Sequence, residues 1–273
     1  MSAGTLRGMG ASLAGVALAA GAGTRLAPIT DSIPKPLCTV AAETLLDLAL
    51  ARLDTVGADL AVNVHHHAAL LRASVGSRAH VVHERPEALG TAGAIANLRD
   101  FIDGRPVVVV NGDTWCPGGL EPLVDGWDGE RVRVFVPGGG DFGPRSAIVG
   151  TLVPWRIVRA LEVTPSGLYE VVWRDEHAAG RLEVVGYDGP WVDCGTPSDL
   201  LEANLAALGQ GTARHRHAIV HGRIDRTAVG ADAVVLGDVS DSVLLAGAEV
   251  AADEVLRRVV RWVEAGRQRT LQL

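Results

Sequence analysis

Residues 13–26 read Leu-Ala-Gly-Val-Ala-Leu-Ala-Ala-Gly-Ala-Gly-Thr-Arg-Leu. The apolar run over 13–20 is too short to span a membrane and lacks the charged segment that opens a signal peptide. A short apolar run that ends in glycines is typical of a β-strand that is buried on both faces and leads into a loop. Glycines in such a loop let backbone N–H groups approach phosphate oxygens closely. The stretch therefore predicts a buried strand followed by a phosphate-binding turn.

Around this strand, helical and strand patterns alternate through the first half of the chain. Residues 1–12 are interpreted as a loose leader, and the leucines of Thr44–Val56 form the first helical stripe. Further elements are expected at 59–64 (strand), 66–75 (helix), 80–82 (strand), 89–101 (helix) and 107–110 (strand). Such alternation implies βαβ units and a mostly parallel sheet.

The second half of the chain is less regular. Strands are expected at 132–136, 147–152, 182–187 and 191–192, with a short helix at 155–161. The segment Pro137–Pro144 is rich in glycine and proline, so it cannot form regular structure. Thr196 as N-cap and Pro197 in the first turn predict a helix that runs to about Leu208 and stops at Gly209.

After residue 209 the pattern changes again. Residues 211–221 are polar and resemble a linker, whereas apolar residues recur every five or six positions over Val229–Val260, with glycines between them. This spacing resembles the hexapeptide repeat of a left-handed parallel β-helix, and a pair of hairpins stays the alternative. Five arginines form a basic tail, which is interpreted as a solvated helix face: Arg257, Arg258, Arg261, Arg267 and Arg269. We therefore predict a main domain over 1–209 and a short β-helix-like region with a basic tail over 210–273.

Composition limits the possible functions. The chain has 273 residues, 48% of them hydrophobic, and a formal net charge of −7. That length suits one large α/β domain with a small appendage. The acidic balance argues against nucleic-acid binding, and no segment predicts membrane insertion. Three scattered cysteines without paired spacing predict reduced thiols in a cytoplasmic protein.

Two cationic residues stand close together in the first forty positions. Gly21-Ala22-Gly23-Thr24-Arg25-Leu26 is followed, after a short gap, by Pro34-Lys35-Pro36, and Lys35 is the only lysine of the chain. The loop is not a P-loop, because no Gly-Lys-Ser/Thr follows. It is not a dinucleotide fingerprint either, because Arg25 and Pro28 interrupt the helix that should follow. One arginine and one lysine in this arrangement could converge on a triphosphate.

This tandem resembles the signature of the sugar-1-phosphate nucleotidyltransferases, also called NDP-sugar pyrophosphorylases, and the resemblance covers most of residues 14–207. It implies a nucleotide-diphospho-sugar transferase fold: a Rossmann-like, mostly parallel mixed sheet flanked by helices, here forming the catalytic domain. By match, Arg25 would bind the β- and γ-phosphates, and Lys35 would hold the phosphates near the reacting centre. The residues expected to bind the nucleotide in this loop are Ala20, Gly21, Ala22, Gly23, Thr24 and Arg25.

A second nucleotide-binding segment is Leu89-Gly90-Thr91-Ala92-Gly93. It looks like the guanylyltransferase and uridylyltransferase branches of the family, in which backbone groups at a helix start shape the pocket for base and ribose. Gly90, Thr91 and Gly93 are therefore further nucleotide-binding candidates. A plain capped helix start is the alternative.

Two aspartates complete the expected site. Asp113 follows a strand in Asn-Gly-Asp, and Asp193 lies in Trp-Val-Asp-Cys-Gly-Thr-Pro. In the family the matching carboxylates ligate Mg²⁺, which needs few protein ligands when phosphate oxygens and water complete its shell. The resemblance implies attack by the sugar-1-phosphate on the α-phosphorus of an NTP, with Arg25, Lys35 and Asp113 as catalytic residues.

The chain departs from the family where the sugar phosphate should bind. Many relatives carry Glu-Lys-Pro after the strand that matches residues 132–136, and its lysine contacts the sugar phosphate. Here that lysine is absent, and the segment 137–146 is shorter than in those relatives. Within it, Gly140-Asp141-Phe142 resembles a motif of the N-acetylmuramate-1-phosphate uridylyltransferase branch. The candidate contacts to the sugar phosphate are Arg145, Gly150 and Asp193.

The leading hypothesis is a Mg²⁺-dependent enzyme that uses GTP and mannose-1-phosphate, with UTP or dTTP and other sugars left open. The alternatives are a non-catalytic regulatory protein that binds nucleotides, and a cytidylyltransferase acting on a non-sugar phosphate. A homodimer is expected. His65-His66-His67 is interpreted as structural, although Asn63 and His66 are candidates to line the pocket. Trp155 and Trp173 are expected in the core.

Overall fold

The computed structural model describes residues 12–273, so the predicted leader lies outside the described residues except for Ser12. Residue contacts divide the chain into two compact units. The first comprises residues 12–21, 49–112 and 116–191, and the second comprises 22–48, 113–115 and 192–273. The division at residue 209 therefore stays a prediction from the sequence. No helix in residues 12–273 is long and apolar enough to cross a membrane.

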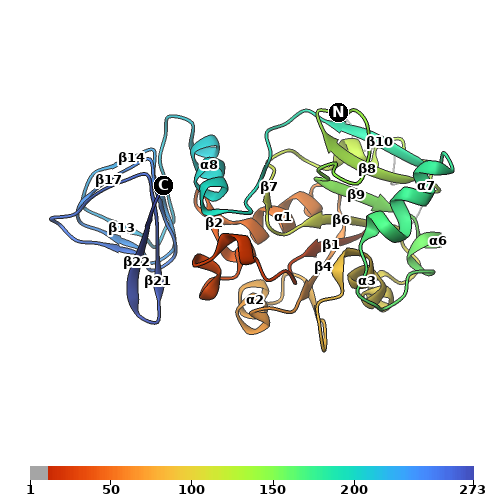
Figure 1. The fold of residues 1–273 in the computed structure, drawn as a ribbon, viewed down its shortest axis with the longest axis horizontal. Helices are drawn as coiled ribbons and strands as arrows, with labels where there is room; N and C mark the ends of the chain where they lie inside the picture. Colours follow the sequence, from red (N-terminus) through yellow and green to blue (C-terminus); the bar gives the residue numbers. More distant parts are fainter. Residues whose placement is uncertain (1–11) are drawn as a thin grey trace. The chain divides into compact units, whose positions relative to one another are not determined.

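A seven-stranded sheet forms the first unit, in the order β10-β8-β9-β6-β1-β4-β5 (Figure 1). Its strands are β1 (Ala14–Leu18), β4 (Asp59–Val64), β5 (His80–His83), β6 (Val107–Asn111), β8 (Val132–Pro137), β9 (Gly150–Val153) and β10 (Leu182–Tyr187). Only β9 runs antiparallel to its neighbours, which confirms the mostly parallel mixed sheet. β9 also begins later than the strand predicted at 147–152.

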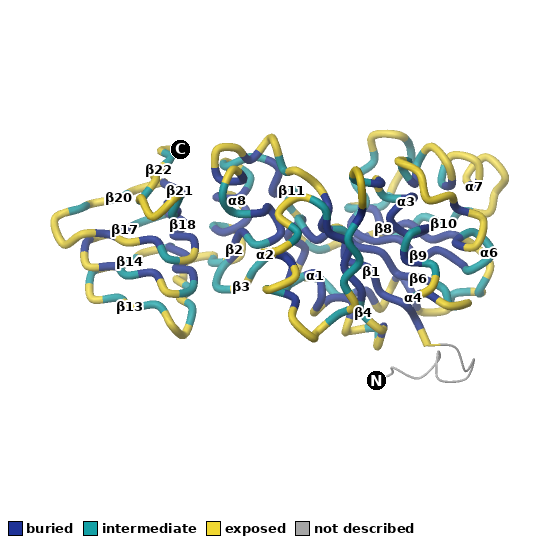
Figure 2. Tube along the Cα trace, turned by 90° about the horizontal axis from the view of Figure 1, so that it is seen from below, coloured by how far each residue is buried: buried dark blue, intermediate teal, exposed yellow. Residues whose placement is uncertain are grey.

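The strand on which the fold prediction rests lies inside this sheet. β1 pairs in parallel with both β4 and β6, and its residues Ala14, Val16 and Ala17 are fully buried (Figure 2). The predicted strand buried on both faces is thus confirmed. Side chains of β1, β4, β6 and β8 pack with those of α3 and η5 into one apolar core.

Short helices accompany the sheet of the first unit. They are α2 (Ala68–Val75), α3 (Gly90–Asn97), α4 (Arg99–Ile102), α5 (Glu121–Val124), α6 (Trp155–Val158), the π-helix η5 (Tyr169–Trp173) and α7 (Arg174–Ala178), while α1 (Leu45–Asp54) crosses the boundary between the units. The pair η5 and α7 was not predicted from the sequence. Trp155 and Trp173 pack against the core as expected.

The first part of the second unit consists of tight turns and one long helix. The turns are η2 (Thr24–Leu26), η3 (Ile29–Asp31) and η4 (Lys35–Leu37), followed by β2 (Thr39–Val40) and β3 (Glu43–Thr44). β7 (Thr114–Trp115) pairs antiparallel with β11 (Val192–Asp193). Helix α8 (Pro197–Leu208) begins with a capping box between Thr196 and Asp199 and ends at Gly209, as predicted.

The rest of the second unit is a coil of short parallel strands, which supports the β-helix-like prediction and excludes the pair of hairpins. Its strands are β12 (Ala213–Arg214), β13 (Ile219–Val220), β14 (Ile224–Asp225), β15 (Ala228–Val229), β16 (Val234–Val235), β17 (Asp238–Ser240), β18 (Val243–Leu244), β19 (Glu249–Val250) and β20 (Val255–Arg257). They pair in parallel, for example Ile219 with Val234 and Val234 with Glu249. The linker predicted at 211–221 is wrong, because β12 and β13 belong to the first turn of this coil.

The basic tail is not a helix, which corrects the sequence interpretation. β21 (Val259–Glu264) and β22 (Arg267–Gln272) form an antiparallel pair. The first four residues of β21, from Val259 to Trp262, are all buried, and the strand pairs residue by residue with β22, so this segment is not a solvated helix face. Arg261 is itself buried and its guanidinium lies 2.7 Å from the Glu254 carboxylate.

Candidate active site

Four of the residues singled out in the sequence meet in the second unit. Lys35 Nζ lies 3.0 Å from Asp113 Oδ2 and 2.9 Å from Asp193 Oδ1. Arg25 Nη2 lies 3.1 Å from Asp193 Oδ2. The Lys35 side chain is only 5% exposed, whereas both carboxylates are partly open to solvent. We call these four residues the Lys35 cluster.

The local sequence explains how Lys35 reaches this position. Pro34 and Pro36 flank it, and their fixed backbone angles set the tight turn η4. Its stem packs beside Gly23, which has φ +65° and would bring an added Cβ within 3.2 Å of the Lys35 Cβ. Gly23 is therefore required both for the left-handed backbone and for the space that the lysine stem occupies.

The pairing of β7 with β11 brings the two aspartates together. Asp193 stands opposite Thr114 in this antiparallel ladder, and Asp113 directly precedes Thr114. Asp113 lies in the turn before β7, so its side chain need not follow the alternation of the strand, and its carboxylate reaches the same lysine ammonium as that of Asp193. Two carboxylates that are far apart in the sequence therefore become neighbours.

Charge governs the pKa values in the cluster. Burial by itself lowers the pKa of Lys35, but the charge of Asp113 and the hydrogen bonds to Asp193 and Asp113 outweigh it, so the pKa is raised. Burial by itself raises the pKa of Asp193, but Lys35 and Arg25 outweigh it, so this pKa is lowered. Both groups are thus held in their charged forms.

The depressed pKa of Asp193 predicts a pH dependence of stability. A carboxyl whose pKa is lower in the folded than in the unfolded state stabilises the fold above the unfolded value, about 3.9, and loses this effect as pH falls through the folded value. The melting temperature of Asp193→Asn should therefore lie below that of the wild type above about pH 5, and the gap should narrow below about pH 4. Thermal melts between pH 3 and 7 test this, and a gap that widens in acid would contradict it.

The carboxylates of Asp113 and Asp193 fit a magnesium ion whose remaining ligands come from the phosphates of the substrate. Asp113 Oδ2 and Asp193 Oδ1 both point at one cation, the Lys35 ammonium, so they can converge on one bound charge. Within residues 12–273 no group of three or more His, Cys, Asp or Glu side chains could hold a metal. Two carboxylates and substrate phosphate are a usual ligand set for Mg²⁺. Asp113 and Asp193 are thus the residues that would hold it.

The segment Gly90–Gly93 lies in the first unit, where it begins α3. Gly90 has φ +68°, and an added Cβ there would lie 2.6 Å from the backbone oxygen of Ser166. At Gly93 an added Cβ would collide with the backbone oxygen of Thr164. Thr91 Oγ1 accepts a hydrogen bond of 2.8 Å from the backbone N–H of Leu168. Both glycines are therefore explained by close packing against residues 164–168, and their contact with a nucleotide stays a prediction.

Substitution at Gly93 should destabilise the fold. Gly93→Ala forces its methyl group into the Thr164 backbone, and overpacking of this kind costs about 1–3 kcal/mol. Gly143→Ala is the matched control, because nothing lies within 4 Å of the added Cβ there. Urea unfolding of both variants measures the difference. Equal free energies of unfolding would contradict the close approach.

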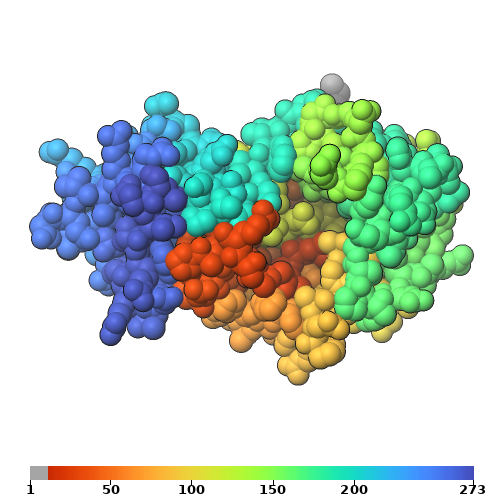
Figure 3. Space-filling view, in the orientation of Figure 1, coloured from red at the N-terminus to blue at the C-terminus, as the bar shows by residue number. Residues whose placement is uncertain are grey.

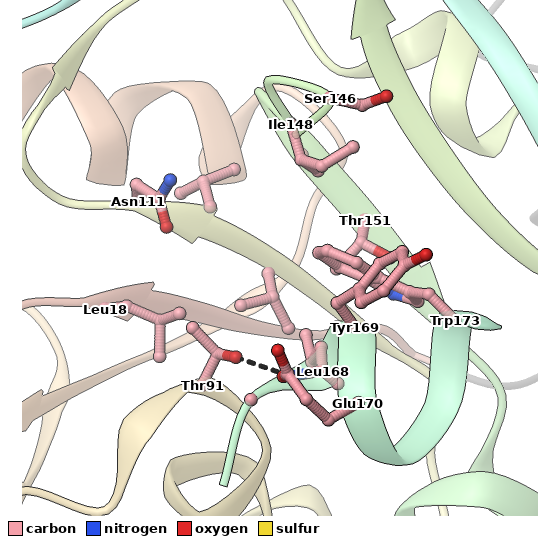
Figure 4. A pocket seen from close by; sticks show the side chains of 14 residues that line it. Leu18, Thr91, Asn111, Ser146, Ile148, Thr151, Leu168, Tyr169, Glu170 and Trp173 are labelled. Atoms are coloured by element: carbon pink, nitrogen blue, oxygen red, sulfur yellow. Dashed lines mark hydrogen bonds between the residues drawn. The ribbon is translucent and has the colours of Figure 1, made fainter. Parts of the chain in front are cut away.

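A pocket of about 280 Å³ opens in the first unit, next to Thr91. Figure 3 shows this hollow, bordered by the yellow segment near residue 90 and the green segment near residue 170. η5 contributes Tyr169, Glu170 and Trp173 to its wall, and Asn111 lies at the end of β6 (Figure 4). Further polar atoms come from Ser146, Thr151 and Thr91, and no lysine or arginine belongs to the lining.

The pocket sorts the remaining sequence candidates. Gly150 lines it, whereas Arg145 is exposed and does not. Asn63 does not line it either, since its side chain is only 2% exposed and is buried in β4, beside the end of β1. His66 is exposed, and His65 contacts the backbone oxygen of Glu84 through Nδ1 at 3.0 Å, in line with a structural role.

Most of the lining residues were missed from the sequence, among them Asn111, Tyr169, Glu170 and Trp173. Asn111 carried a usable signal, because it ends a buried strand just before the Gly-Asp motif, where open α/β sheets bind ligands. The other three carried none, because a π-helix has no apolar repeat of its own and is recognised only in the structure.

Comparisons with known proteins agree with this geometry. Residues 14–134 match the family model described as nucleotidyl transferase. The chain is 31% identical to N-acetylmuramate α-1-phosphate uridylyltransferase of Caulobacter vibrioides over 69% of this chain and 95% of that protein. It is 29% identical to mannose-1-phosphate guanylyltransferase of Mycobacterium tuberculosis over 86% of this chain and 76% of that protein.

A solved structure shares the fold. It is the crystal structure, in complex with sucrose, of a Bacillus anthracis protein assigned as a glucose-1-phosphate thymidylyltransferase. The TM-score is 0.63 at 21% identity, covering 72% of this chain and 95% of that one. With the sequence matches, these findings show that the chain belongs to the sugar-1-phosphate nucleotidyltransferase family and is an enzyme of that type. Members of this family generally depend on a divalent metal ion.

Proposed function

We propose that the chain transfers a nucleotidyl group from an NTP to a sugar-1-phosphate with Mg²⁺ as cofactor, and that GTP and mannose-1-phosphate are the first pair to test. The convergence of Arg25, Lys35, Asp113 and Asp193 carries this proposal, since it joins two phosphate-binding cations to two metal-binding carboxylates. The relative that acts on mannose-1-phosphate and the segment Leu89–Gly93 support the first choice of pair.

Each residue of the Lys35 cluster would have a defined part. Arg25, which is open to solvent, would bind the β- and γ-phosphates, and Lys35 would stay close to the α-phosphate. Asp113 and Asp193 would hold Mg²⁺, whose charge offsets that of the phosphates when it is bound. An oxygen of the sugar phosphate attacks the α-phosphorus of the NTP. At the same time the bond between this phosphorus and the oxygen that bridges it to the β-phosphate breaks, so pyrophosphate leaves. Positioning and charge stabilisation are sufficient for this step.

The lining of the pocket in the first unit supports a neutral sugar. Hydroxyl, amide and carboxylate groups beside aromatic rings are suited to hydrogen-bond and stack on a monosaccharide. Glu170 is the one charged residue of the lining. The lactyl carboxylate of N-acetylmuramate would face this negative charge without any cation to offset it. We therefore expect the protein to prefer mannose- or glucose-type sugar-1-phosphates to N-acetylmuramate-1-phosphate as substrates.

Removing the charge of Glu170 should relax this preference. Glu170→Gln should raise kcat/KM for N-acetylmuramate-1-phosphate about fivefold to tenfold relative to mannose-1-phosphate, the size expected for one partly solvated charge pair. Competition assays with both sugars measure the ratio. Glu162→Gln, which changes an exposed carboxylate outside the pocket, should leave it unchanged. An unaltered ratio in Glu170→Gln would contradict the charge argument.

The decisive experiment for the activity is a panel. GTP, UTP, dTTP, ATP and CTP are each paired with several sugar-1-phosphates and with phosphocholine, and pyrophosphate release is followed. We expect release with at least one sugar-1-phosphate. Silence across the panel from folded protein that still binds NTP would favour the non-catalytic alternative, and release with phosphocholine alone would favour the cytidylyltransferase.

The missing lysine leaves the sugar phosphate with few candidates. Gly150 lines the pocket and could offer its backbone, whereas Arg145 adjoins the lining residue Ser146 in the sequence. Both stay proposed contacts, together with Asp193. A cytoplasmic location and a homodimer are also part of the proposal; the first is supported by three buried, unpaired cysteines. Light scattering of the purified protein tests the second.

A further inference from the structure

The Glu84 side chain is fully buried in the first unit, although it belongs neither to the pocket lining nor to the Lys35 cluster. Its Oε1 accepts a hydrogen bond from Asn63 Nδ2 at 2.7 Å, and its Oε2 accepts one from the backbone N–H of Leu89, also at 2.7 Å. Within the described residues it has no ion-pair partner. A buried carboxylate is costly unless it is hydrogen-bonded, so these two bonds are what keep it in place.

Asn63 continues the chain of hydrogen bonds. Its side chain is 2% exposed, and Oδ1 accepts a hydrogen bond of 2.9 Å from the backbone N–H of Ala19. A backbone N–H can only donate, which fixes Oδ1 toward Ala19 and turns Nδ2 toward Glu84. The same reasoning at Leu89 makes Oε2 of Glu84 an acceptor. The direction of every bond from Ala19 to Leu89 is thus determined.

The two ends of this relay are the origins of the two nucleotide-binding segments. Ala19 directly follows β1 and precedes Ala20 and Gly21 of the phosphate loop. Leu89 directly precedes Gly90, at which α3 begins. The middle is held by the sheet, because Asn63 pairs with Leu18 in the ladder of β1 and β4, and the Glu84 N–H bonds to the Val64 oxygen.

We propose that Asn63 and Glu84 are positioning residues that fix the start of the phosphate loop relative to the start of the Gly90–Gly93 segment, so that one NTP can engage both. This inference rests on the proposed nucleotidyltransferase function. Both side chains are buried, Glu84 at 0% and Asn63 at 2% exposed, so they would act through the backbone of Ala19 and Leu89. Small displacements of binding groups are sufficient to matter, since about 1 Å can cost about 100-fold in rate.

The determined directions allow a test by exchange of amide and acid. In Glu84→Gln, the new amide turns a donor toward either Asn63 Nδ2 or the Leu89 N–H. In Asn63→Asp, two carboxylates face each other. In the double variant, the new carboxylate at position 63 accepts from the Ala19 N–H and from the new amide at position 84, whose oxygen accepts from the Leu89 N–H. All three hydrogen bonds are then restored, and only the bond between positions 63 and 84 has its donor and acceptor exchanged. The side-chain volumes are nearly the same in the wild type and in all three variants.

The readout is the KM for the NTP, at saturating sugar-1-phosphate. Each single variant should raise it about 10- to 100-fold, and the double variant should return to within about fivefold of the wild type. A merely structural role would reduce the amount of active protein and hence the apparent kcat, while leaving KM unchanged. Glu87→Gln, an exposed glutamate in the same segment, is the matched control.

The outcomes separate this inference from the function on which it rests. Wild-type protein without turnover would refute the proposed function. Wild-type turnover with an unchanged NTP KM in both folded single variants would refute the positioning role alone. If a single variant does not fold, the double variant decides: a KM within about fivefold of the wild type supports the relay, and a larger rise overturns it.

Discussion

Asp113→Asn should lower kcat for pyrophosphate release at least about 1,000-fold without unfolding the protein. Asp113 Oδ2 and Asp193 Oδ1 converge on one point, which Lys35 Nζ occupies at 3.0 and 2.9 Å. Asparagine keeps the shape of the side chain but removes half of the negative charge that would hold Mg²⁺ beside the phosphates. Initial rates at saturating NTP, sugar-1-phosphate and Mg²⁺ measure the loss.

The control for this variant is Asp253→Asn, which removes an exposed carboxylate from the C-terminal coil of the same unit. It should keep wild-type rates. A circular dichroism spectrum shows whether Asp113→Asn is folded. Retention of more than about a tenth of wild-type kcat in folded Asp113→Asn would rule out a metal-holding role for this aspartate.

Lys35→Met should have the second largest effect, a fall in kcat/KM for the NTP of about 100- to 1,000-fold. Methionine fills the space of the buried stem but removes the only lysine ammonium of the chain. Lys35→Arg should not restore activity. The Lys35 side chain is only 5% exposed, and the larger planar guanidinium of arginine does not fit the buried space that the lysine occupies. Steady-state kinetics with varied NTP measure both variants.

The same substitution should also shift the pH profile. Lys35 contributes to the lowered pKa of Asp193, so its removal should raise that pKa and move the acidic limb of the activity profile to higher pH. Arg159→Met removes an exposed arginine instead and should move neither rate nor profile. An unshifted acidic limb in Lys35→Met would show that Lys35 and Asp193 are not coupled in solution.

The Lys35 cluster could be proposed from the sequence because its parts sit in short motifs with strong local constraints. Gly23 permits the left-handed backbone that this turn needs, and the prolines on both sides of Lys35 restrict the backbone around it. The C-terminal coil could be proposed because its apolar residues recur every five or six positions, and this spacing is visible in the sequence. Each of these features depends on residues that are close together in the chain, so it can be recognised from a single sequence.

The pocket could not be anticipated in the same way. Tyr169, Glu170 and Trp173 come together through a π-helix, which leaves no repeat in the sequence. The basic tail was misread because its arginines stand out, whereas Val260 and Trp262, which are buried, decide the strand. The relay through Asn63 and Glu84 was also hidden, since only the structure shows that both side chains are buried and aligned.

One measurement tests the central claim most directly: the fate of oxygen in the sugar phosphate. Sugar-1-phosphate labelled with ¹⁸O in its phosphate group is incubated with the NTP that the panel selects, Mg²⁺ and the wild-type protein. If its oxygen attacks the α-phosphorus, mass spectrometry finds all the label in the NDP-sugar and none in an equal amount of released pyrophosphate. Label in the pyrophosphate, or pyrophosphate released without any NDP-sugar, would contradict nucleotidyl transfer by this chain.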